Sequence, residues 1–155
     1  MRRILTTLTI LTLIIVPQLA SADDVDDLKA TNKKVFKLSW STDPKDLEAF
    51  ADSVCDEILW MDAEYAFPFT MTKEELKQSK MEWYSKGEYC EWIEQKSIYR
   101  VVGNTGFVYE YGTEIKKYKD NPEVIRNIRN SFIYLKIKGK WLFYSGHVSR
   151  IPSGN

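Results

Sequence analysis

Apolar residues recur with helical spacing in two stretches of the first half of the chain. Asp43 and Pro44, a capping residue and a first helical position, precede the first stretch. The pattern predicts one long helix from Asp43 to Leu59, because its apolar stripe has charged residues on the opposite side. The stripe consists of Leu47, Phe50, Ala51, Val54, Cys55, Ile58 and Leu59. A capping box, Thr72-Lys73-Glu74-Glu75, predicts a second helix to about Lys86, with Leu76, Trp83 and the stem of Lys80 facing inward.

The second half of the chain has the β-branched and aromatic richness of strands. It predicts four of them: Tyr89 to Val102, Thr105 to Lys117, Val124 to Lys138, and a last one from Trp141 onward. The predicted turns fall at Gly103-Asn104 and Gly139, and a polar loop from Tyr118 to Glu123 contains Asn121-Pro122. Helices followed by an uninterrupted run of strands indicate an α+β fold, with the helices on one face of an antiparallel sheet.

Three segments are less defined by their pattern. Asp23 to Asn32 is acidic and polar, which fits a mobile leader or a short helix. Lys33 to Trp40 alternates apolar and polar residues, and it fits either an added edge strand or a packed arm. Met61 to Phe69 is a short extended run ended by Pro68.

The last strand contains His147, the single histidine of the chain. Alternate residues of a strand share a face of the sheet, so the residues of this strand divide into two sets. One face would carry Trp141, Phe143, Ser145, His147 and Ser149, and the other would carry Leu142, Tyr144, Gly146 and Val148.

The closing hairpin of Gly139-Lys140-Trp141, followed by His147-Val148-Ser149, resembles the SnoaL-like branch of the nuclear-transport-factor-2-like superfamily. The resemblance spans roughly Asp43 to Pro152. It implies a cone, in which a long helix and a shorter helix pack on the concave face of a curved antiparallel sheet. The resemblance therefore gives a SnoaL-like domain over 43–152. The rest of the chain is expected to divide into a signal peptide over 1–22, an N-terminal arm over 23–42 and a tail over 153–155.

The N-terminus has the three parts of a secretory signal peptide. Arg2 and Arg3 precede an apolar run from Ile4 to Val16, and the small residues of Ala20-Ser21-Ala22 follow. We expect cleavage after Ala22 and export to a periplasm or to the medium. The alternative, a membrane anchor, requires a longer unbroken apolar stretch than this one. After cleavage, 20 basic and 22 acidic residues remain, so neither a membrane nor a nucleic acid is an expected partner.

Cys55 and Cys90 are the two cysteines. An even number of cysteines in an exported chain fits a disulfide, and two buried free thiols are the alternative. No histidine lies near either cysteine in the sequence, so neither a metal site nor a cofactor is predicted.

The abundance of Phe, Tyr and Trp suits an apolar pocket with a few polar groups. His147 could act there as an acid or a base with Glu110 or Asp62, and Tyr65 or Tyr109 could donate a hydrogen bond. The alternative is a structural histidine bonded to Ser145, Ser149 or a carboxylate of a helix. The pocket-lining candidates are His147, Ser145, Ser149, Trp141, Phe143, Tyr65, Asp62 and Glu110.

The segment from Asp62 to Pro68 resembles the one that supplies the catalytic base in steroid isomerases of the superfamily. Phe67 stands at the position of that base, and a phenyl ring cannot accept a proton. The expected function is therefore an exported domain that binds a small ligand or acts as an accessory, without demonstrable chemistry. One alternative is an isomerase, lyase or cyclase-like enzyme that uses His147 with a carboxylate; another is a protein-interaction module with a filled cavity.

Apolar residues on the other face of the sheet would be exposed in a monomer. The resemblance implies a homodimer through this convex face, unless loops or the N-terminal arm cover it. The residues expected there are Phe132, Tyr134, Tyr144 and Val148.

Overall fold

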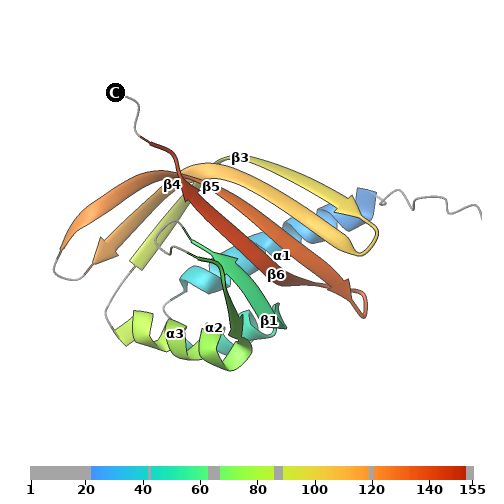
Figure 1. Cartoon of the computed structure of the whole chain (residues 1–155), viewed down its shortest axis with the longest axis horizontal. Helices are drawn as coiled ribbons and strands as arrows, with labels where there is room; N and C mark the ends of the chain where they lie inside the picture. The colour runs from blue at the N-terminus through green and yellow to red at the C-terminus, as the bar shows by residue number, and fades with distance from the viewer. Residues whose placement is uncertain (1–21, 42, 63–66, 86–88, 119–120, 153–155) are drawn as a thin grey trace, which may run out of the picture.

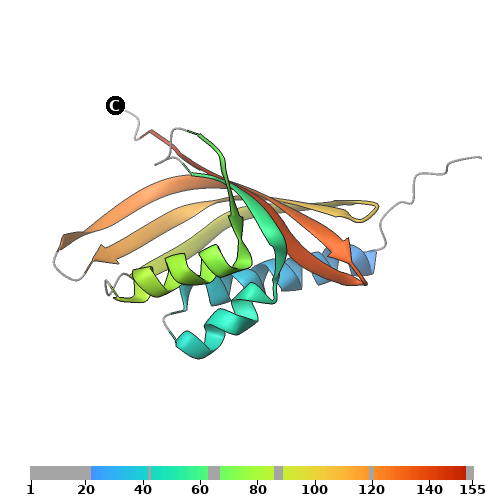
Figure 2. The ribbon, with the colours of Figure 1, turned by 60° about the horizontal axis from the view of Figure 1, so that its bottom comes forward.

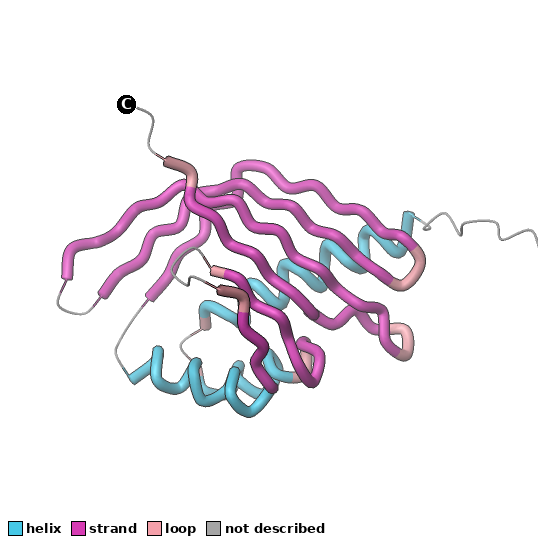
Figure 3. Tube along the Cα trace, viewed as in Figure 1, coloured by secondary structure: helices cyan, strands magenta, loops and turns pink. Residues whose placement is uncertain are grey.

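The structure is a computed structural model, which describes residues 22–41, 43–62, 67–85, 89–118 and 121–152 of the 155-residue chain. The helices are α1 (Ala22–Trp40), α2 (Pro44–Ala51) and α3 (Lys73–Ser85). The strands are β1 (Val54–Met61), β2 (Phe69–Thr72), β3 (Tyr89–Val102), β4 (Thr105–Tyr118), β5 (Asn121–Ile137) and β6 (Lys140–Arg150). Figure 3 shows where helix and strand alternate along the chain. The predicted signal peptide lies outside the described residues, except for Ala22, the first residue of α1.

The six strands form one curved sheet in the order β2-β1-β6-β5-β4-β3. All neighbours are antiparallel except β1 and β6, which are parallel. The sheet arches over the helices, which all lie on its concave side (Figures 1 and 2). This arrangement confirms the predicted α+β cone. No helix in the described part of the chain is both long enough and apolar enough to cross a membrane.

The long helix of the cone is α1, rather than the predicted helix from Asp43 to Leu59. Its buried residues Leu28, Asn32, Val35 and Leu38 recur every three or four positions, and they face the sheet. Helix α1 packs against β3, β4 and β6. Neither alternative for Lys33 to Trp40, an edge strand or an arm, is what forms there.

The helix that starts at Asp43 is short. Asp43 Oδ1 accepts a hydrogen bond from the Lys45 amide at 2.9 Å, as predicted for the cap. The helix ends at Ala51, and the Ser53 carbonyl already accepts from the Phe143 amide of β6 at 3.0 Å. The register of β1 against β6 shifts between Val54 and Leu59. This bulge places buried residues at irregular intervals in β1, which imitates helical spacing and explains the wrong prediction.

The capping box and the strands of the second half are confirmed. Thr72 Oγ1 accepts from the Glu75 amide at 3.3 Å, and Glu75 Oε2 accepts from the Thr72 amide at 2.8 Å. The predicted strands match β3 to β6 within a few residues at each end. The turn between β5 and β6 has positive φ at Lys138 and Gly139, 49° and 80°, as a tight hairpin requires.

A bulge in β6 reverses the predicted faces of its second half. Phe143 is opposite Tyr134 of β5, but Ser145 is opposite Ile133, so the register shifts by one residue at Tyr144. Trp141 and Phe143 face the concave side as predicted. Beyond the bulge it is Gly146 and Val148 that face inward, because a shift of one residue moves each following side chain to the other face. His147 is exposed on the convex side, directly across from Ser131.

The same reversal and the burial of β5 correct the predicted convex face. Phe132 and Tyr134 are 5% and 1% exposed, and they belong to the core under the sheet. Val148 also faces inward, so Tyr144 is the one member of the predicted set that is exposed on the convex side.

Cys55 and Cys90 are free and buried, so the disulfide alternative is wrong for this structure. Cys55 lies on β1 and Cys90 on β3, and β6, β5 and β4 stand between these strands in the sheet. Burial raises the pKa of both thiols, that of Cys90 to about 12.

Candidate functional site

A cavity of about 260 Å³ lies between the concave face of the sheet and the three helices. Residues of every helix and strand line it. Nine of the 22 residues that line it are aromatic: Phe36, Trp40, Phe50, Trp60, Phe69, Trp92, Phe132, Tyr134 and Phe143. The polar lining consists of Ser39, Asp62, Ser79, Lys80, Glu114, Lys116 and Asn130.

The aromatic side chains form a continuous wall. The ring of Phe36 on α1 lies 5.6 Å from that of Trp92 and 5.8 Å from that of Phe132. The ring of Phe143 lies 5.7 Å from that of Phe132 and 5.9 Å from that of Trp60. These centroid distances fall in the range of favourable tilted and edge-to-face pairs, so the rings hold one another in place.

Two tryptophans of this wall pack directly against glycines of the sheet. A Cβ at Gly146 of β6 would overlap the ring of Trp60, and one at Gly112 of β4 would overlap the ring of Trp92. Both glycines are on the concave face, so each indole can lie directly on the sheet.

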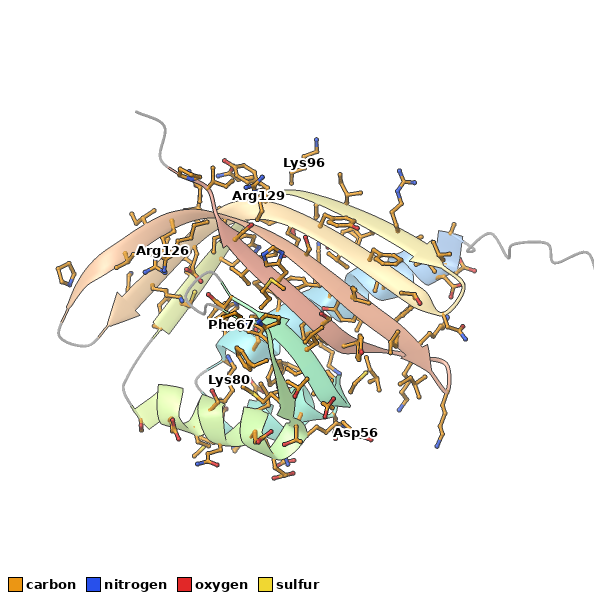
Figure 4. All side chains as sticks on the ribbon, viewed as in Figure 1. Asp56, Phe67, Lys80, Lys96, Arg126 and Arg129 are labelled. Carbon is orange, nitrogen blue, oxygen red and sulfur yellow. The ribbon has the colours of Figure 1, made fainter. Side chains whose placement is uncertain are left out.

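Lys80 of α3, labelled in Figure 4, lines the cavity. Its amine lies beside two aromatic rings. Lys80 Nζ donates to the Ser39 carbonyl at 2.5 Å, and it lies 5.2 Å from the ring centre of Trp40 and 5.6 Å from that of Phe50. Burial lowers the pKa of Lys80 to about 8, and the nearby Lys116 acts in the same direction. The amine also binds a terminal carbonyl of α1, so Lys80 connects α3 to α1.

Glu114 of β4 brings a buried carboxylate to the cavity wall, with 6% of its surface exposed. Its oxygens lie 3.6 Å from Lys116 Nζ and 4.0 Å from a guanidinium nitrogen of Arg126. Burial raises the pKa of Glu114, while the two cations act against the rise. Within the described residues, no three His, Cys, Asp or Glu side chains are grouped as metal ligands.

A second buried carboxyl group, Glu110, lies in a polar network behind the cavity wall. Asn32 of α1 donates from Nδ2 to Glu110 Oε1 at 2.6 Å, and its Oδ1 accepts from the Tyr134 hydroxyl at 2.8 Å. The same Nδ2 lies 3.3 Å from the Tyr99 hydroxyl. Burial raises the pKa of Glu110 to about 7, although the Asn32 hydrogen bond opposes the rise. Tyr134 links this network to the cavity, which it lines.

No protein-family model and no curated protein matches this sequence. Solved structures do match. A candidate dehydratase of the nuclear-transport-factor-2-like family from Streptomyces avermitilis is 13% identical, with a TM-score of 0.70 over 84% of this chain and 98% of its own. The chain has the nuclear-transport-factor-2-like fold.

Two further structures share it. A nuclear-transport-factor-2-like protein from Cytophaga hutchinsonii is 19% identical, with a TM-score of 0.63 over 85% of this chain and 100% of its own. A candidate scytalone dehydratase from Novosphingobium aromaticivorans is 17% identical, with a TM-score of 0.64 over 83% of this chain and 87% of its own. The SnoaL-like branch within this fold stays a prediction.

The nuclear-transport-factor-2-like cone brings only part of the predicted pocket set together. Phe143 and Asp62 line the cavity, and Glu110 is buried behind its wall. Trp141 is buried in the core outside the cavity lining. Tyr65 lies outside the described residues.

The predicted pairing of His147 with Glu110 or Asp62 is not formed. His147 is exposed on the convex side, whereas both carboxyl groups lie on the concave side. Ser145 and Ser149 share the outer face of β6 with His147, and Ser149 Oγ donates to the Arg129 carbonyl at 3.4 Å. Tyr109 is 48% exposed on the same convex side.

The residues that sequence reasoning missed are Glu114, Lys116 and Asn130 among the polar groups of the cavity, and the tryptophans Trp60 and Trp92. Lys80 was predicted to face inward from its helix, but not as a residue of the pocket. The sequence of β4 did contain one indication of the site. Every second residue of this strand faces the concave side: Gly106, Val108, Glu110, Gly112, Glu114 and Lys116. The glycines among them indicate a face against which other side chains pack closely, and the charged residues indicate a polar site on it.

Proposed function

We propose that this protein is an exported binding domain, which holds a small apolar or amphipathic ligand in the cavity under the sheet. The observation that carries the proposal is the aromatic cavity of about 260 Å³. An apolar cavity of about 150 Å³ can hold benzene, so this one has room for a substituted ring. A cone filled by its own side chains, as in an interaction module, would lack such a space.

The polar groups of the cavity support an amphipathic ligand. Binding pockets are commonly apolar with a few polar groups that orient the ligand. Here Lys80, Glu114 and Asn130 supply a cation, a carboxyl group and an amide among aromatic rings. A ligand with an apolar body and one polar substituent would match this distribution.

Export is part of the proposal because of the N-terminal sequence. The basic start, the apolar run and the small residues before Ala22 fit a cleaved signal peptide. Helix α1 begins at Ala22, so cleavage after this residue would leave the packed part of the helix intact.

A matched pair of substitutions on β6 tests the binding proposal. Val148→Trp places a large ring in the cavity, and His147→Trp places the same ring on the opposite face. Native mass spectrometry of protein purified from its own host should find a small apolar compound on the wild type and on His147→Trp, and none on Val148→Trp. If all three proteins carry no compound and bind no added ring compound, the proposal is wrong.

An enzyme is the second candidate, and Glu114 is the observation that favours it. This carboxyl group is at the cavity wall with a raised pKa, which suits a group that takes up and releases a proton. Two structural neighbours are candidate dehydratases. In such a reaction a base removes a proton from the carbon next to a carbonyl. The protonated base can then give that proton to the hydroxyl on the adjacent carbon, whose C–O bond breaks so that water leaves and a carbon–carbon double bond forms.

The enzyme proposal is tested with β-hydroxy ketones of one ring, whose dehydration gives an enone that absorbs in the ultraviolet. We expect Glu114→Gln to abolish any turnover and His147→Ala to leave it unchanged. Turnover that persists in Glu114→Gln would exclude this carboxyl group as the base.

A further inference from the structure

We propose that the cavity ligand is a neutral ring compound with a hydroxyl group, and that Asn130 Oδ1 accepts the hydrogen bond of that hydroxyl. This inference rests on the proposed binding function and specifies the ligand class. It is carried by the side chain of Asn130 on β5, which lines the cavity.

Asn130 is 4% exposed, and its Oδ1 has no hydrogen-bond partner among the described residues. A buried amide oxygen without a partner is rare in folded proteins, because leaving it unpaired costs free energy. A polar atom of this kind in a cavity wall is a place where a donor on a ligand gains a contact that water would otherwise supply.

The orientation of the Asn130 amide follows from the position of Glu110. Asn130 is directly opposite Glu110 in the β4–β5 register. Burial raises the pKa of Glu110 to about 7, and the side chains of Asn32 and Asn130 both act against the rise. Because the amide nitrogen donates and the oxygen cannot, Nδ2 is the end of Asn130 that faces the carboxyl group. The oxygen is therefore on the side away from Glu110.

Apart from Glu110 on β4, the nearest neighbours of Asn130 on the concave face of β5 and β6 are apolar. Ile128 and Phe132 are two residues away along β5, and Val148 is directly across on β6. The ligand must therefore match apolar side chains and also donate a hydrogen bond to Asn130 Oδ1. An apolar ring with one hydroxyl group does both, since the ring contacts the side chains and the O–H donates to Oδ1. A carboxylate has no proton to donate at neutral pH, so an acid is a poorer match for this acceptor.

Two probes of nearly equal shape test the inference. p-Cresol and p-xylene differ by a hydroxyl in place of a methyl group, so their affinities report on the acceptor. Titration calorimetry gives both dissociation constants for the wild type, for Asn130→Leu and for Asn127→Leu. Asn127 is the matched control, because it lies on the same strand but is exposed on the convex face.

The ratio of the p-xylene to the p-cresol dissociation constant cancels the general apolar affinity of the cavity. We expect this ratio to fall at least about fivefold in Asn130→Leu, the worth of one hydrogen bond, and to stay constant in Asn127→Leu. Thermal unfolding checks that each variant is folded. If Asn130→Leu does not fold, Asn130→Val removes the same acceptor with a smaller side chain that suits a strand.

The outcomes separate the two proposals. If the wild type binds both probes and the ratio is the same in Asn130→Leu, the hydroxyl inference is wrong while the binding function stands. If neither probe binds the wild type, the binding function fails, and the inference fails with it.

Discussion

The clearest consequence of the structure is a pH-dependent cost of burying Glu110. Its carboxyl group is 4% exposed, and it accepts a hydrogen bond from Asn32 while Glu94 adds a repulsive charge. Asn130 lies directly opposite Glu110, and the hydroxyl groups of Tyr99 and Tyr134 contact Asn32. We expect Glu110→Gln to remove the pH dependence, since the glutamine has a similar shape and carries no charge.

The magnitude follows from the pKa in the two states. The ordinary value is 4.5, and burial raises the pKa to about 7 in the folded protein. Below pH 4.5 the group is protonated in both states, so it has no ionisation cost. Between pH 4.5 and 7 the unfolded chain loses the proton and the folded protein keeps it, so folding stability decreases. Above pH 7 the free energy of unfolding has decreased by about 3 kcal/mol, since each unit of difference in pKa corresponds to about 1.36 kcal/mol.

Urea unfolding of the wild type and of Glu110→Gln, followed by tryptophan fluorescence from pH 4 to 8, measures this loss. Other titrating groups are common to both proteins and cancel in the difference. Glu110→Gln should gain relative stability steadily across this window, by about 3 kcal/mol in total. A difference that is constant with pH would refute the assignment of a raised pKa to Glu110.

Three further predictions concern packing, capping and assembly. Gly146→Ala should destabilise the fold by about 1–3 kcal/mol in urea unfolding, because the added methyl group overlaps Trp60. Asp43→Ala should cost about 1 kcal/mol in the same assay, because the Lys45 amide loses its capping partner. We also expect a dimer through the convex face, so light scattering should give the mass of two chains for the wild type and of one chain for Tyr109→Lys. A single-chain mass for the wild type at micromolar concentration would contradict the dimer.

Local sequence signals predicted the second half of the fold well. Sequence reasoning predicted strands β3 to β6, the capping box at Thr72 and the hairpin at Gly139. Each of these depends on residues that are close together in the sequence. Two of the errors, one in element and one in face, occur at bulges, whereas the helix that forms over Lys33 to Trp40 was missed without one. A bulge in β1 made a strand look helical, and a bulge at Tyr144 turned His147 outward. No residue type at these positions distinguishes a bulge from a regular strand.

The site was harder to predict, because its groups meet only in three dimensions. Asn32 and Glu110 are 78 positions apart in the sequence, and their hydrogen bond depends on the placement of α1 under the sheet. Lys80 had been assigned to the inward face of α3, but its contact with the Ser39 carbonyl of α1 requires the helix–helix packing. A single histidine was a strong chemical signal in the sequence, and the register of one strand removed it from the cavity.

A crystal structure of the mature protein grown with p-cresol tests the central claim most directly. The account predicts density for one ring between the sheet and the helices, in contact with Phe36 and Phe132, with its hydroxyl within hydrogen-bond distance of Asn130 Oδ1. A cavity closed by a shift of Trp60 or Trp92, or p-cresol bound on the convex face alone, would contradict it.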